Sequence, residues 1–460
     1  MTSGREWADR FVAGLHELVV LGHGGAALGR CYAPSVEFGA YVPGEVVRAH
    51  SRDSALAVLE RWHGQPGELL HGSSHVFSDQ VGSVVGVVAD LEWRVPSAAD
   101  QRAQQTVHRR THYLHVGEEG VHRHLVVSDH PRSEQRPPEA EPGPVLRGLY
   151  ASAVKRDAAE PGASRTPIER VETSGGETFF VKWCVPGQDW QGRLTGDTGR
   201  EAALWTQGWL DRLPDGLSHP IVAAEPFGAG MWVTISRDLT PYLLRGRRLS
   251  LAEMRGYVSA LDAMYAAFKG SGVPNCLASL EQRWGLLWPS AVEREYNQPD
   301  KFVKEVARGW DLLDQVVPSD LVDVVRGIVA DPVRVTGGLE PAFLHGDAIP
   351  ANAAIVGSEQ VLFDWSLATA GPPEAETAWL ANFAQFYAFG IDELLGLWRS
   401  LRDGRHDERA LGLCLLGQAS GLVPALACSA VDFPDPAHRR LSRGKLDWWC
   451  ETVRRYAHLL

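Results

Sequence analysis

The sequence predicts an α+β chain built from more than one domain. With 460 residues it exceeds the size of one ordinary hydrophobic core, so two or three domains are expected. Helical patterns and then long strand-like runs occupy residues 1–132, and a second strand-rich part, 147–240, leads into a mainly helical part, 241–460. Residues 133–146 carry four prolines among charged residues, a composition that predicts an extended linker.

The bulk composition is typical of a globular protein in a reducing compartment. The chain is 44% hydrophobic and 22% charged, and its net charge of −12 argues against a nucleic-acid partner. Six cysteines are scattered without a CxxC spacing, which favours buried thiols over a disulfide framework or a zinc site. Because no basic-then-apolar leader opens the chain, we expect a cytoplasmic protein.

One apolar stretch is long enough to span a bilayer. Residues Ala410–Val431 contain no charged side chain over 22 residues. Three glycines, Gln418 and Pro424 interrupt the stretch, which lies late in a chain of otherwise soluble composition. We therefore predict two buried core helices that are broken near Pro424, and no membrane partner.

Helical patterns and strand-like runs alternate in the first 132 residues. Trp7, Phe11 and Leu15 recur at helical spacing, and Ser51 is placed to cap a second helix, Asp53–Trp62. Helices followed by a long antiparallel meander predict a sheet wrapped around a helix. The strand-like runs are Val36–Val42, Leu69–Asp79, Ser83–Val95, Gln104–Val116 and Val121–His130.

This order resembles the ketosteroid-isomerase-like (polyketide-cyclase-like) α+β cone. The resemblance rests on WADRFVAGL, RCYAPSVEF, SRDSALAVLERWHG and the four closing strands. It implies an enclosed pocket, which in some members of that family holds an Asp or His acid/base. In others the domain serves dimerisation or ligand binding, so a homodimer through residues 1–132 is one expectation.

Histidine is concentrated in this part of the chain, where 12 of the 17 lie at or before His130. Because alternate strand residues share a face, His108 and His112 are expected together, as are His122 and His124. One interpretation is an acid/base or metal site in the pocket, with Asp90 and Tyr113 as further pocket residues. The other, which we favour, is a polar outer face of the sheet.

A lysine stands inside an apolar strand pattern of the second strand-rich part. Lys182 lies within TFFVKWCV, where an ammonium group is costly unless it has an anionic partner. Glu201 follows 19 residues later at the start of a helical run and is well placed to pair with it. A strand Lys and a helix Glu hold the α- and β-phosphates of a nucleotide in kinases, although an ordinary structural ion pair is the alternative.

Two neighbouring segments are candidates for nucleotide contacts. The turn Asp157–Ser164 has one glycine, so Ser164 and the neighbouring amides are the groups that would cradle phosphate. A predicted hairpin over residues 221–236 is followed by a hinge. We expect Ile235, Arg237 and Leu239 to meet the nucleotide base there.

The segment FLHGDAIPANAAIVGSEQVLFDW, residues 343–365, has the pattern of a loop, a strand, a tight turn and a second strand. Asp347, Asn352 and Asp364 fall at the ends of these elements. A base and two oxygen ligands on neighbouring loops are what metal-assisted phosphoryl transfer requires.

From about residue 147 to the end, the chain resembles the aminoglycoside phosphotransferase family, a branch of the kinase-like fold. The family pattern HGDxxxxN…DW is matched by HGDAIPAN and FDW, and a Gly-Asp-Pro-x-x-Asp segment has its counterpart in GPPEAE. Glu376 replaces the usual Asp of that segment, and Tyr265 stands where a His is common. Ala348 and Pro350 also depart from the commoner residues of the loop.

The resemblance implies a bilobal kinase-like fold that uses ATP and Mg²⁺, with a β-rich lobe over 147–240 and a helical lobe over 241–460. Asp347 would be the catalytic base, and Asn352 and Asp364 the magnesium ligands. Lys182, oriented by Glu201, would hold the phosphates. Glu376 would support the catalytic loop.

The leading hypothesis is an ATP/Mg-dependent O-phosphotransferase that acts on a hydroxyl of a small molecule, either an aminoglycoside-like antibiotic or a biosynthetic intermediate. Acidic residues such as Glu374, Asp392 and Glu393 would face a cationic acceptor, or be solvated instead. A second hypothesis is a two-step enzyme whose N-terminal domain eliminates or cyclises the phosphorylated product. A third is a ligand-sensing regulatory protein whose kinase-like domain is inactive.

Overall fold

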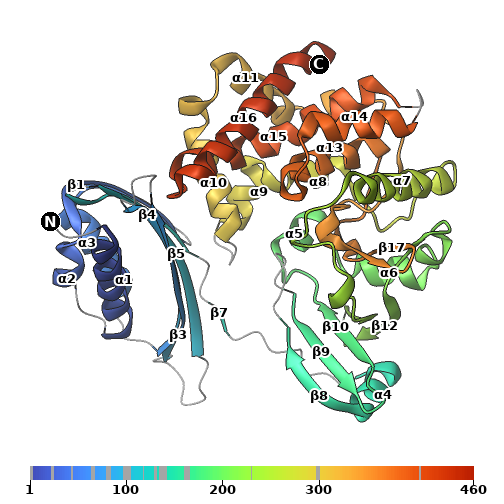
Figure 1. Cartoon of the computed structure of the whole chain (residues 1–460), viewed down its shortest axis with the longest axis horizontal. Coiled ribbons are helices and arrows are strands. Elements are labelled where there is room, and N and C mark those ends of the chain that lie inside the picture. The colour runs from blue at the N-terminus through green and yellow to red at the C-terminus, as the bar shows by residue number, and fades with distance from the viewer. Residues whose placement is uncertain are drawn as a thin grey trace. The chain divides into compact units, whose positions relative to one another are not determined.

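The structure is a computed structural model of the 460-residue chain. It groups the chain into two compact units, whose elements are labelled in Figure 1. Unit 1 comprises Met1–Gln135, Leu287–Val322 and Leu422–Glu451, and unit 2 comprises Arg136–Leu286, Asp323–Gly421 and Thr452–Leu460. The predicted domain boundaries stay predictions. The residues described are 4–21, 25–42, 45–63, 68–78, 84–96, 105–117, 119–128, 132–133, 142–159, 166–228, 230–296, 301–402 and 406–460.

The N-terminal part of unit 1 is a sheet in the order β2-β1-β6-β5-β4-β3, with β7 beside β5. Neighbouring strands run antiparallel except β1 and β6, which are parallel. Each of the five predicted strand-like runs forms a strand, so that expectation is confirmed. The strands are β1 Tyr32–Val42, β2 Glu45–Ser51, β3 Glu68–Ser78, β4 Val84–Pro96, β5 Gln105–Gly117, β6 Gly120–Ser128 and β7 Arg132–Ser133.

Three helices cover one face of this sheet: α1 Gly4–Leu21, α2 Gly25–Gly29 and α3 Arg52–His63 (Figure 1). Ser51 caps α3 as predicted, since its Oγ accepts a bond of 3.3 Å from the Ser54 amide. The resemblance to the α+β cone stays a prediction. The buried core between helices and sheet includes Phe11, Leu15, Leu18, Phe38, Leu59, Leu91, Trp93, Leu114 and Val126.

Two of the predicted histidines lie inside this core rather than on a polar outer face. His112 and His124 are both 0% exposed, so the interpretation that we favoured is wrong for them. His112 Nδ1 lies 3.0 Å from His124 Nε2, and the Tyr32 hydroxyl bonds to His124 Nδ1. Burial lowers the pKa of His124 to about 3 and holds the pKa of His112 well below its usual value. The side chain of His108 is outside the described part of the chain.

The buried pair makes stability depend on pH. Between pH 6.5 and about 3 the unfolded chain binds a proton at His124 that the folded chain does not, so stability falls as pH falls through this window. The slope for one such proton is about 1.4 kcal/mol per pH unit. We expect His124→Gln to shrink the difference in the urea midpoint between pH 7 and pH 4.5, whereas His75→Gln, at an exposed position of β3, leaves it unchanged. An equal difference in both variants would contradict this.

The opposite face of the sheet packs against helices of the same unit. Tyr41, Val88 and Tyr113 form an apolar cluster with Cys428 and Phe433. The Tyr41 hydroxyl also donates a bond of 2.7 Å to Asp311 Oδ2, and the Tyr113 hydroxyl donates to Glu305. This face is therefore occupied within the chain, and the predicted homodimer stays a prediction. The helices concerned are α10 Lys301–Val316 and the parts within unit 1 of α15 Glu408–Asp432 and α16 Pro436–Tyr456, and α9, Pro289–Glu295, precedes α10 in the same unit.

Asp432 forms two ion pairs, one with Arg123 of the sheet and one with Arg308 of α10. Its carboxylate is 2% exposed and lies 2.7 Å from Arg308 Nε and 2.6 Å from Arg123 Nη2. Removing it leaves two largely buried guanidiniums without this partner, so Asp432→Ala is expected to lower the free energy of unfolding by about 3–5 kcal/mol. Arg10→Ala, which breaks an exposed pair with Glu6, is expected to cost less than about 1 kcal/mol. Equal losses in thermal denaturation would contradict the role of Asp432.

Unit 2 contains an antiparallel sheet in the order β12-β13-β10-β9-β8. The pattern predicts a strand-rich section from Leu146, but the helix α4, Pro144–Ser152, comes first. Leu146, Leu149 and Tyr150 lie at helical spacing and pack against the core of the sheet, and Glu225 accepts from the Val145 and Leu146 amides. The strands are β8 Ala153–Ala158, β9 Ile168–Thr173, β10 Thr178–Cys184, β12 Ile221–Phe227 and β13 Met231–Arg237.

Helices make up most of the rest of unit 2 (Figure 1). A capping box begins α7, because Ser250 Oγ accepts from the Glu253 amide at 3.2 Å and Glu253 Oε2 accepts from the Ser250 amide at 2.8 Å. The helices are α5 Trp190–Thr195, α6 Arg200–Thr206, α7 Leu251–Phe268, α8 Leu280–Trp284, α12 Val333–Thr336, α13 Pro373–Phe383 and α14 Ile391–Arg402, with α11, Ser319–Ala330, beginning in unit 1.

The apolar stretch near the end forms one helix, so the predicted break near Pro424 is wrong. The helix α15 runs from Glu408 to Asp432 with Pro424 inside it. Among the described helices it alone is long and apolar enough to cross a membrane, and its most apolar 18-residue window is 89% buried, as in a core helix. Burial of its apolar side chains outweighs the one backbone hydrogen bond that proline removes.

Candidate active site

The predicted loop and hairpin form as expected. The strand β15, Ala342–Leu344, leads into the loop, and β16, Ala353–Val356, pairs antiparallel with β17, Glu359–Leu362. Ala353 is the partner of Leu362, so Asn352 and Asp364 emerge from the same end of the hairpin. The Phe363 amide donates to the Asn352 carbonyl at 3.1 Å. The spacing of these two residues is therefore a consequence of hairpin register.

Asp347 lies in the loop before this hairpin and is surrounded by donors. Its Oδ2 accepts from Asn352 Nδ2 at 2.7 Å, and its Oδ1 accepts from the indole N–H of Trp379. Arg283 Nη2 lies 3.8 Å from Oδ1. Burial raises the pKa of the Asp347 carboxyl, and Arg283 opposes that rise. The result is a fixed carboxylate whose basicity is increased by its surroundings.

Lys182 of β10 joins two carboxylates. Its Nζ lies 2.8 Å from Asp364 Oδ1 and 3.2 Å from Glu201 Oε2, so the predicted partnership with Glu201 is present in the geometry. Burial pushes the pKa of Lys182 down, but Asp364 and Glu201 outweigh it and hold that pKa well above its ordinary value. For Asp364, burial is outweighed by Lys182, and its pKa is lowered. The lysine is thus charged, and it is held by both the α6 carboxylate and the hairpin carboxylate.

A cavity of about 300 Å³ lies over these groups. Lys182, Glu201, Asn352 and Asp364 line it. So do Arg237 and Leu239, two of the three predicted base contacts. The third, Ile235, is 2% exposed with its side chain in the core of the sheet, and its neighbours Thr234 and Ser236 line the cavity instead. Ser164 is outside the described residues.

Glu376 supports the loop through four donors. Its Oε1 accepts from the amides of Gly346 at 2.6 Å and Ala348 at 3.2 Å. Its Oε2 accepts from the His345 amide at 3.3 Å and from the Tyr265 hydroxyl at 2.8 Å. Gly346 has φ +80°, and a Cβ there would lie 1.7 Å from the Leu367 carbonyl oxygen, so the turn requires glycine. Glu376 therefore fixes the conformation of the loop that carries Asp347.

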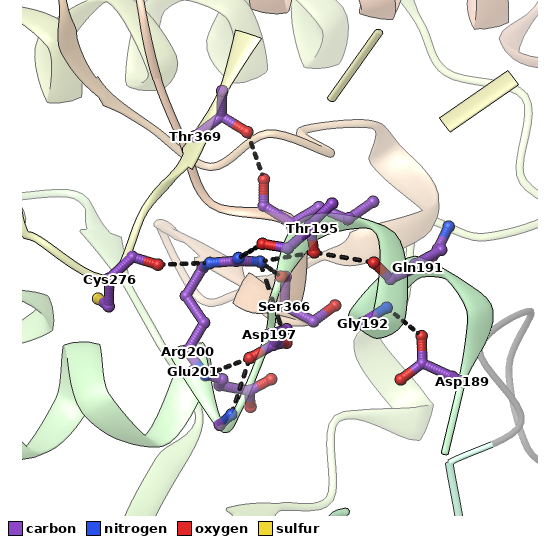
Figure 2. Close-up of polar contacts among 12 residues, drawn as sticks. Asp189, Gln191, Gly192, Thr195, Asp197, Arg200, Glu201, Cys276, Ser366 and Thr369 are labelled. Carbon is purple, nitrogen blue, oxygen red and sulfur yellow. Dashed lines mark hydrogen bonds and ion pairs between the residues drawn. The ribbon is translucent and has the colours of Figure 1, made fainter. Parts of the chain in front are cut away.

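Arg200 is a site residue that the sequence analysis missed. It is 3% exposed, directly precedes Glu201, and reaches three separate carbonyls, as Figure 2 shows. Its guanidinium donates to Cys276 O at 2.7 Å, to Thr195 O at 3.0 Å and to the carbonyl of Ser366. Ser366 Oγ in turn donates to Asp364 Oδ1 at 2.9 Å. Arg200 thus fixes α6 to the segment that carries Asp364.

We expect Arg200→Gln to lower kcat by about 10- to 100-fold, because Glu201 and Asp364 lose the anchor that sets their distance to Lys182. Arg200→Lys, which keeps one donor group, is expected to recover part of that loss. Arg193 is a matched control, since it donates to the carbonyls of Gly187 and Gln188, both at 2.9 Å, but makes no such bond to Ser366. If Arg193→Gln lowers kcat as much as Arg200→Gln, the positioning role is wrong.

The acidic residues offered for a cationic acceptor have other partners. Glu374 is 4% exposed and lies 3.0 Å from Arg402 Nη1, so it is neither solvated nor facing a substrate. Glu393 Oε2 accepts from the Gly390 amide at 3.2 Å. Asp392 is exposed in the first turn of α14, where a carboxylate suits the helix N-terminus. Of the two interpretations left open for these residues, Glu374 fits neither, because it is buried and paired with Arg402.

Trp379 was also missed, although the sequence held a signal for it. It follows Glu376 by three residues on α13, so the two side chains share a face of that helix, and Glu376 lies under the loop. Arg283 gave no local signal, because it reaches the loop from α8, where its Nε donates to Gly346 O at 2.8 Å.

Comparison with known proteins assigns the region that holds this loop. Residues 247–411 match the model of the phosphotransferase enzyme family. This segment is similar to that family. It contains Asp347, Asn352, Asp364 and Glu376, the residues predicted to form the catalytic loop and its support. No curated protein matches the chain.

Solved phosphotransferase structures resemble this chain at low sequence identity and low TM-score. A thermostable mutant of aminoglycoside phosphotransferase APH(4)-Ia is 14% identical over 67% of this chain and 97% of its own, with a TM-score of 0.41. Spectinomycin phosphotransferase APH(9)-Ia is 10% identical over 71% and 100%, with a TM-score of 0.43. Choline kinase LicA from Streptococcus pneumoniae is 10% identical over 68% and 98%, with a TM-score of 0.42. At these values the assignment rests on the family match.

Proposed function

We propose that this phosphotransferase moves the γ-phosphoryl group of ATP onto a hydroxyl of a small molecule, with Asp347 as the base. The observation that carries the proposal is the convergence of Lys182, Glu201, Asn352 and Asp364 on one cavity of about 300 Å³, with Asp347 bonded to Asn352. The six cysteines are all free thiols, which supports a reducing, cytoplasmic location.

The residues present fit a magnesium ion shared with nucleotide phosphates. Lys182 and Ser366 both bond to Asp364 Oδ1, which leaves Oδ2 to face a cation. Asn352 turns its Nδ2 toward Asp347, so its Oδ1 is the amide atom suited to a cation. No cluster of three or more His, Cys, Asp or Glu side chains that could hold a metal occurs among the described residues. Two protein oxygens plus phosphate oxygens are how Mg²⁺ is commonly held, and the ion neutralises charge on the phosphates.

The chain's own groups divide the work of the transfer. Lys182 places a fixed positive charge where the phosphates would lie, and Glu201 keeps it there. The oxygen of the acceptor hydroxyl attacks the γ-phosphorus while Asp347 takes the hydroxyl proton, and the bond between the γ-phosphorus and the ADP oxygen breaks. Trp379 and Asn352 hold the carboxylate so that its orientation is set before the acceptor arrives.

In the N-terminal part, the described residues offer no observation that favours a second chemical step. The His112 and His124 side chains have no exposed surface, so a substrate has no access to them in this structure. We therefore propose phosphoryl transfer alone.

The test uses the purified full chain. We expect ATP with Mg²⁺ to raise the melting temperature, EDTA to reduce that shift, and mass spectrometry to detect a phosphorylated product in a screen of hydroxyl compounds. The screen includes aminoglycosides and neutral biosynthetic intermediates, since both classes carry suitable hydroxyls. If nucleotide gives no Mg²⁺-dependent shift and the screen yields no product, the proposal fails.

A further inference from the structure

A row of three aromatic side chains leads away from the catalytic loop. Trp379 and Phe383 lie on α13, and Phe386 follows in the 3₁₀ helix Ala384–Tyr387. The ring centres of Trp379 and Phe383 are 4.9 Å apart, and those of Phe383 and Phe386 are 6.0 Å apart. Trp379 and Phe383 are half-buried, whereas Phe386 is 63% exposed. We call these three residues the aromatic row.

The aromatic row begins at the catalytic carboxylate itself. The Trp379 indole N–H donates to Asp347 Oδ1, so the Trp379 ring is in contact with the group that would take the acceptor's proton. Successive members at i, i+4 and i+7 keep to one side of a helical segment, so the row continues from Asp347 toward the surface. An acceptor whose hydroxyl reaches Asp347 has this row as an adjoining wall.

Two arginines lie near the aromatic row or the adjoining 3₁₀ helix. The Arg283 guanidinium lies 4.2 Å from the centre of the Trp379 ring and 3.8 Å from Asp347 Oδ1. It already occupies the position over the Trp379 ring that would attract a cationic ligand. Arg245, which is exposed, lines the nucleotide cavity beside Ala351 and acts electrostatically on Tyr387 of the same 3₁₀ helix as Phe386.

The carboxylates described beside these groups are already engaged within the chain. Asp347 lies 3.8 Å from Arg283 and accepts from the Trp379 indole. Glu376 is buried beneath the loop and accepts from Gly346, Ala348 and Tyr265. Glu374 is paired with Arg402. A polycationic acceptor would therefore meet the exposed Arg245 and an aromatic surface, beside carboxylates that already have partners.

We propose that the aromatic row is the acceptor-binding wall, and that the acceptor is a hydroxyl compound with a flat unsaturated ring and no positive charge. This rests on the proposed function, and names the substrate class for the same site. The acceptor ring stacks on Phe386 and Phe383, an arrangement that aromatic rings favour. Its hydroxyl oxygen bonds to the γ-phosphorus, the bond to the ADP oxygen breaks, and the hydroxyl proton passes to Asp347.

Binding is measured first, because it does not depend on turnover. The probes are phenyl β-D-glucoside, cyclohexyl β-D-glucoside, kanamycin and choline, each titrated by saturation-transfer NMR against the full chain with ADP and Mg²⁺. We expect the phenyl compound to bind at least 10-fold more tightly than the other three. Phe386→Ser is expected to lower the affinity for the phenyl compound by about 10-fold, and Phe386→Trp is expected to restore that affinity.

Val333 provides the matched control, since it is an apolar residue of unit 2 that is 66% exposed and lies on α12, outside the row. Val333→Ser is expected to leave the affinity for phenyl β-D-glucoside unchanged. Tighter binding of kanamycin or choline, equal binding of the phenyl and cyclohexyl compounds, or an affinity unaffected by Phe386→Ser would each overturn the inference.

The outcome is separable from that of the proposed function. If ATP-dependent phosphorylation of a cationic acceptor occurs and is lost in Asp347→Asn, phosphoryl transfer stands and the aromatic acceptor is wrong. If the phenyl compound binds through Phe386 but no compound of the wider hydroxyl screen is phosphorylated, the binding wall stands and the proposed function fails.

Discussion

Replacing Asp347 by asparagine is expected to lower kcat by about 10²- to 10⁴-fold, the range that general-base groups supply. Asparagine keeps the size of the side chain, but its amide cannot accept a proton near neutral pH. It also offers one oxygen where Trp379 and Asn352 now donate to two, so one of those bonds is lost. The measurement is initial rate against ATP concentration with a substrate from the screen, which separates kcat from the KM for ATP.

Nucleotide binding to the variant shows whether the loss of kcat comes from the chemical step or from weaker ATP binding. Asp347 makes no bond to Lys182, so the thermal shift with ATP and Mg²⁺ is expected to persist in Asp347→Asn. Asp215→Asn, at an exposed position of the same unit, is expected to retain full activity. If Asp347→Asn keeps more than about a tenth of kcat, this residue is not the base.

Replacing Glu376 by alanine is expected to be the most damaging change to the loop. It leaves the amides of His345, Gly346 and Ala348 and the Tyr265 hydroxyl without their buried acceptor. Each unsatisfied buried donor costs about 1–3 kcal/mol, but partial relaxation and water entry make a total of about 3–5 kcal/mol the reasonable expectation. Because these amides shape the loop that carries Asp347, kcat is expected to fall below detection.

Tyr265→Phe is the graded control for this network. It removes one donor and leaves the three amide bonds to Glu376 in place, so thermal denaturation should show a loss of about 0.5–1.5 kcal/mol with kcat reduced only a few-fold. Glu376→Asp restores the residue type that the family resemblance led us to expect, but its shorter side chain cannot span the same four donors. Equal stability of Glu376→Ala and Tyr265→Phe would show that the amide bonds contribute nothing.

Local patterns determined much of the site. The hairpin, the Ser250–Glu253 capping box and the spacing of Asp347, Asn352 and Asp364 each arise within a short stretch of chain, where turn geometry and strand register leave few alternatives. Lys182 and Glu201 were predictable across 19 residues, because an ammonium group in an apolar strand requires an anionic partner.

Only the tertiary structure decided features that depend on distant contacts. The parallel pairing of β1 with β6 joins residues 86 to 89 positions apart in the chain. It brings His124 under the helices together with Tyr32, which a periodicity argument could not foresee. Helix α15 continues through Pro424 because the surrounding packing supplies what proline removes.

The same division holds within the site. The sequence by itself indicated which groups are proposed to do the chemistry, since acids, bases and phosphate-binding cations must be of certain types at certain spacings. The tertiary structure decided how they are held and what lies beside them. Arg200 anchors α6 to Ser366, and Trp379 and Arg283 surround Asp347, from elements that are separate in the chain. Long side chains such as Arg200 and Arg283 reach such partners only after folding, so the local sequence pattern does not indicate them. Trp379 differs, because its spacing from Glu376 was a usable signal.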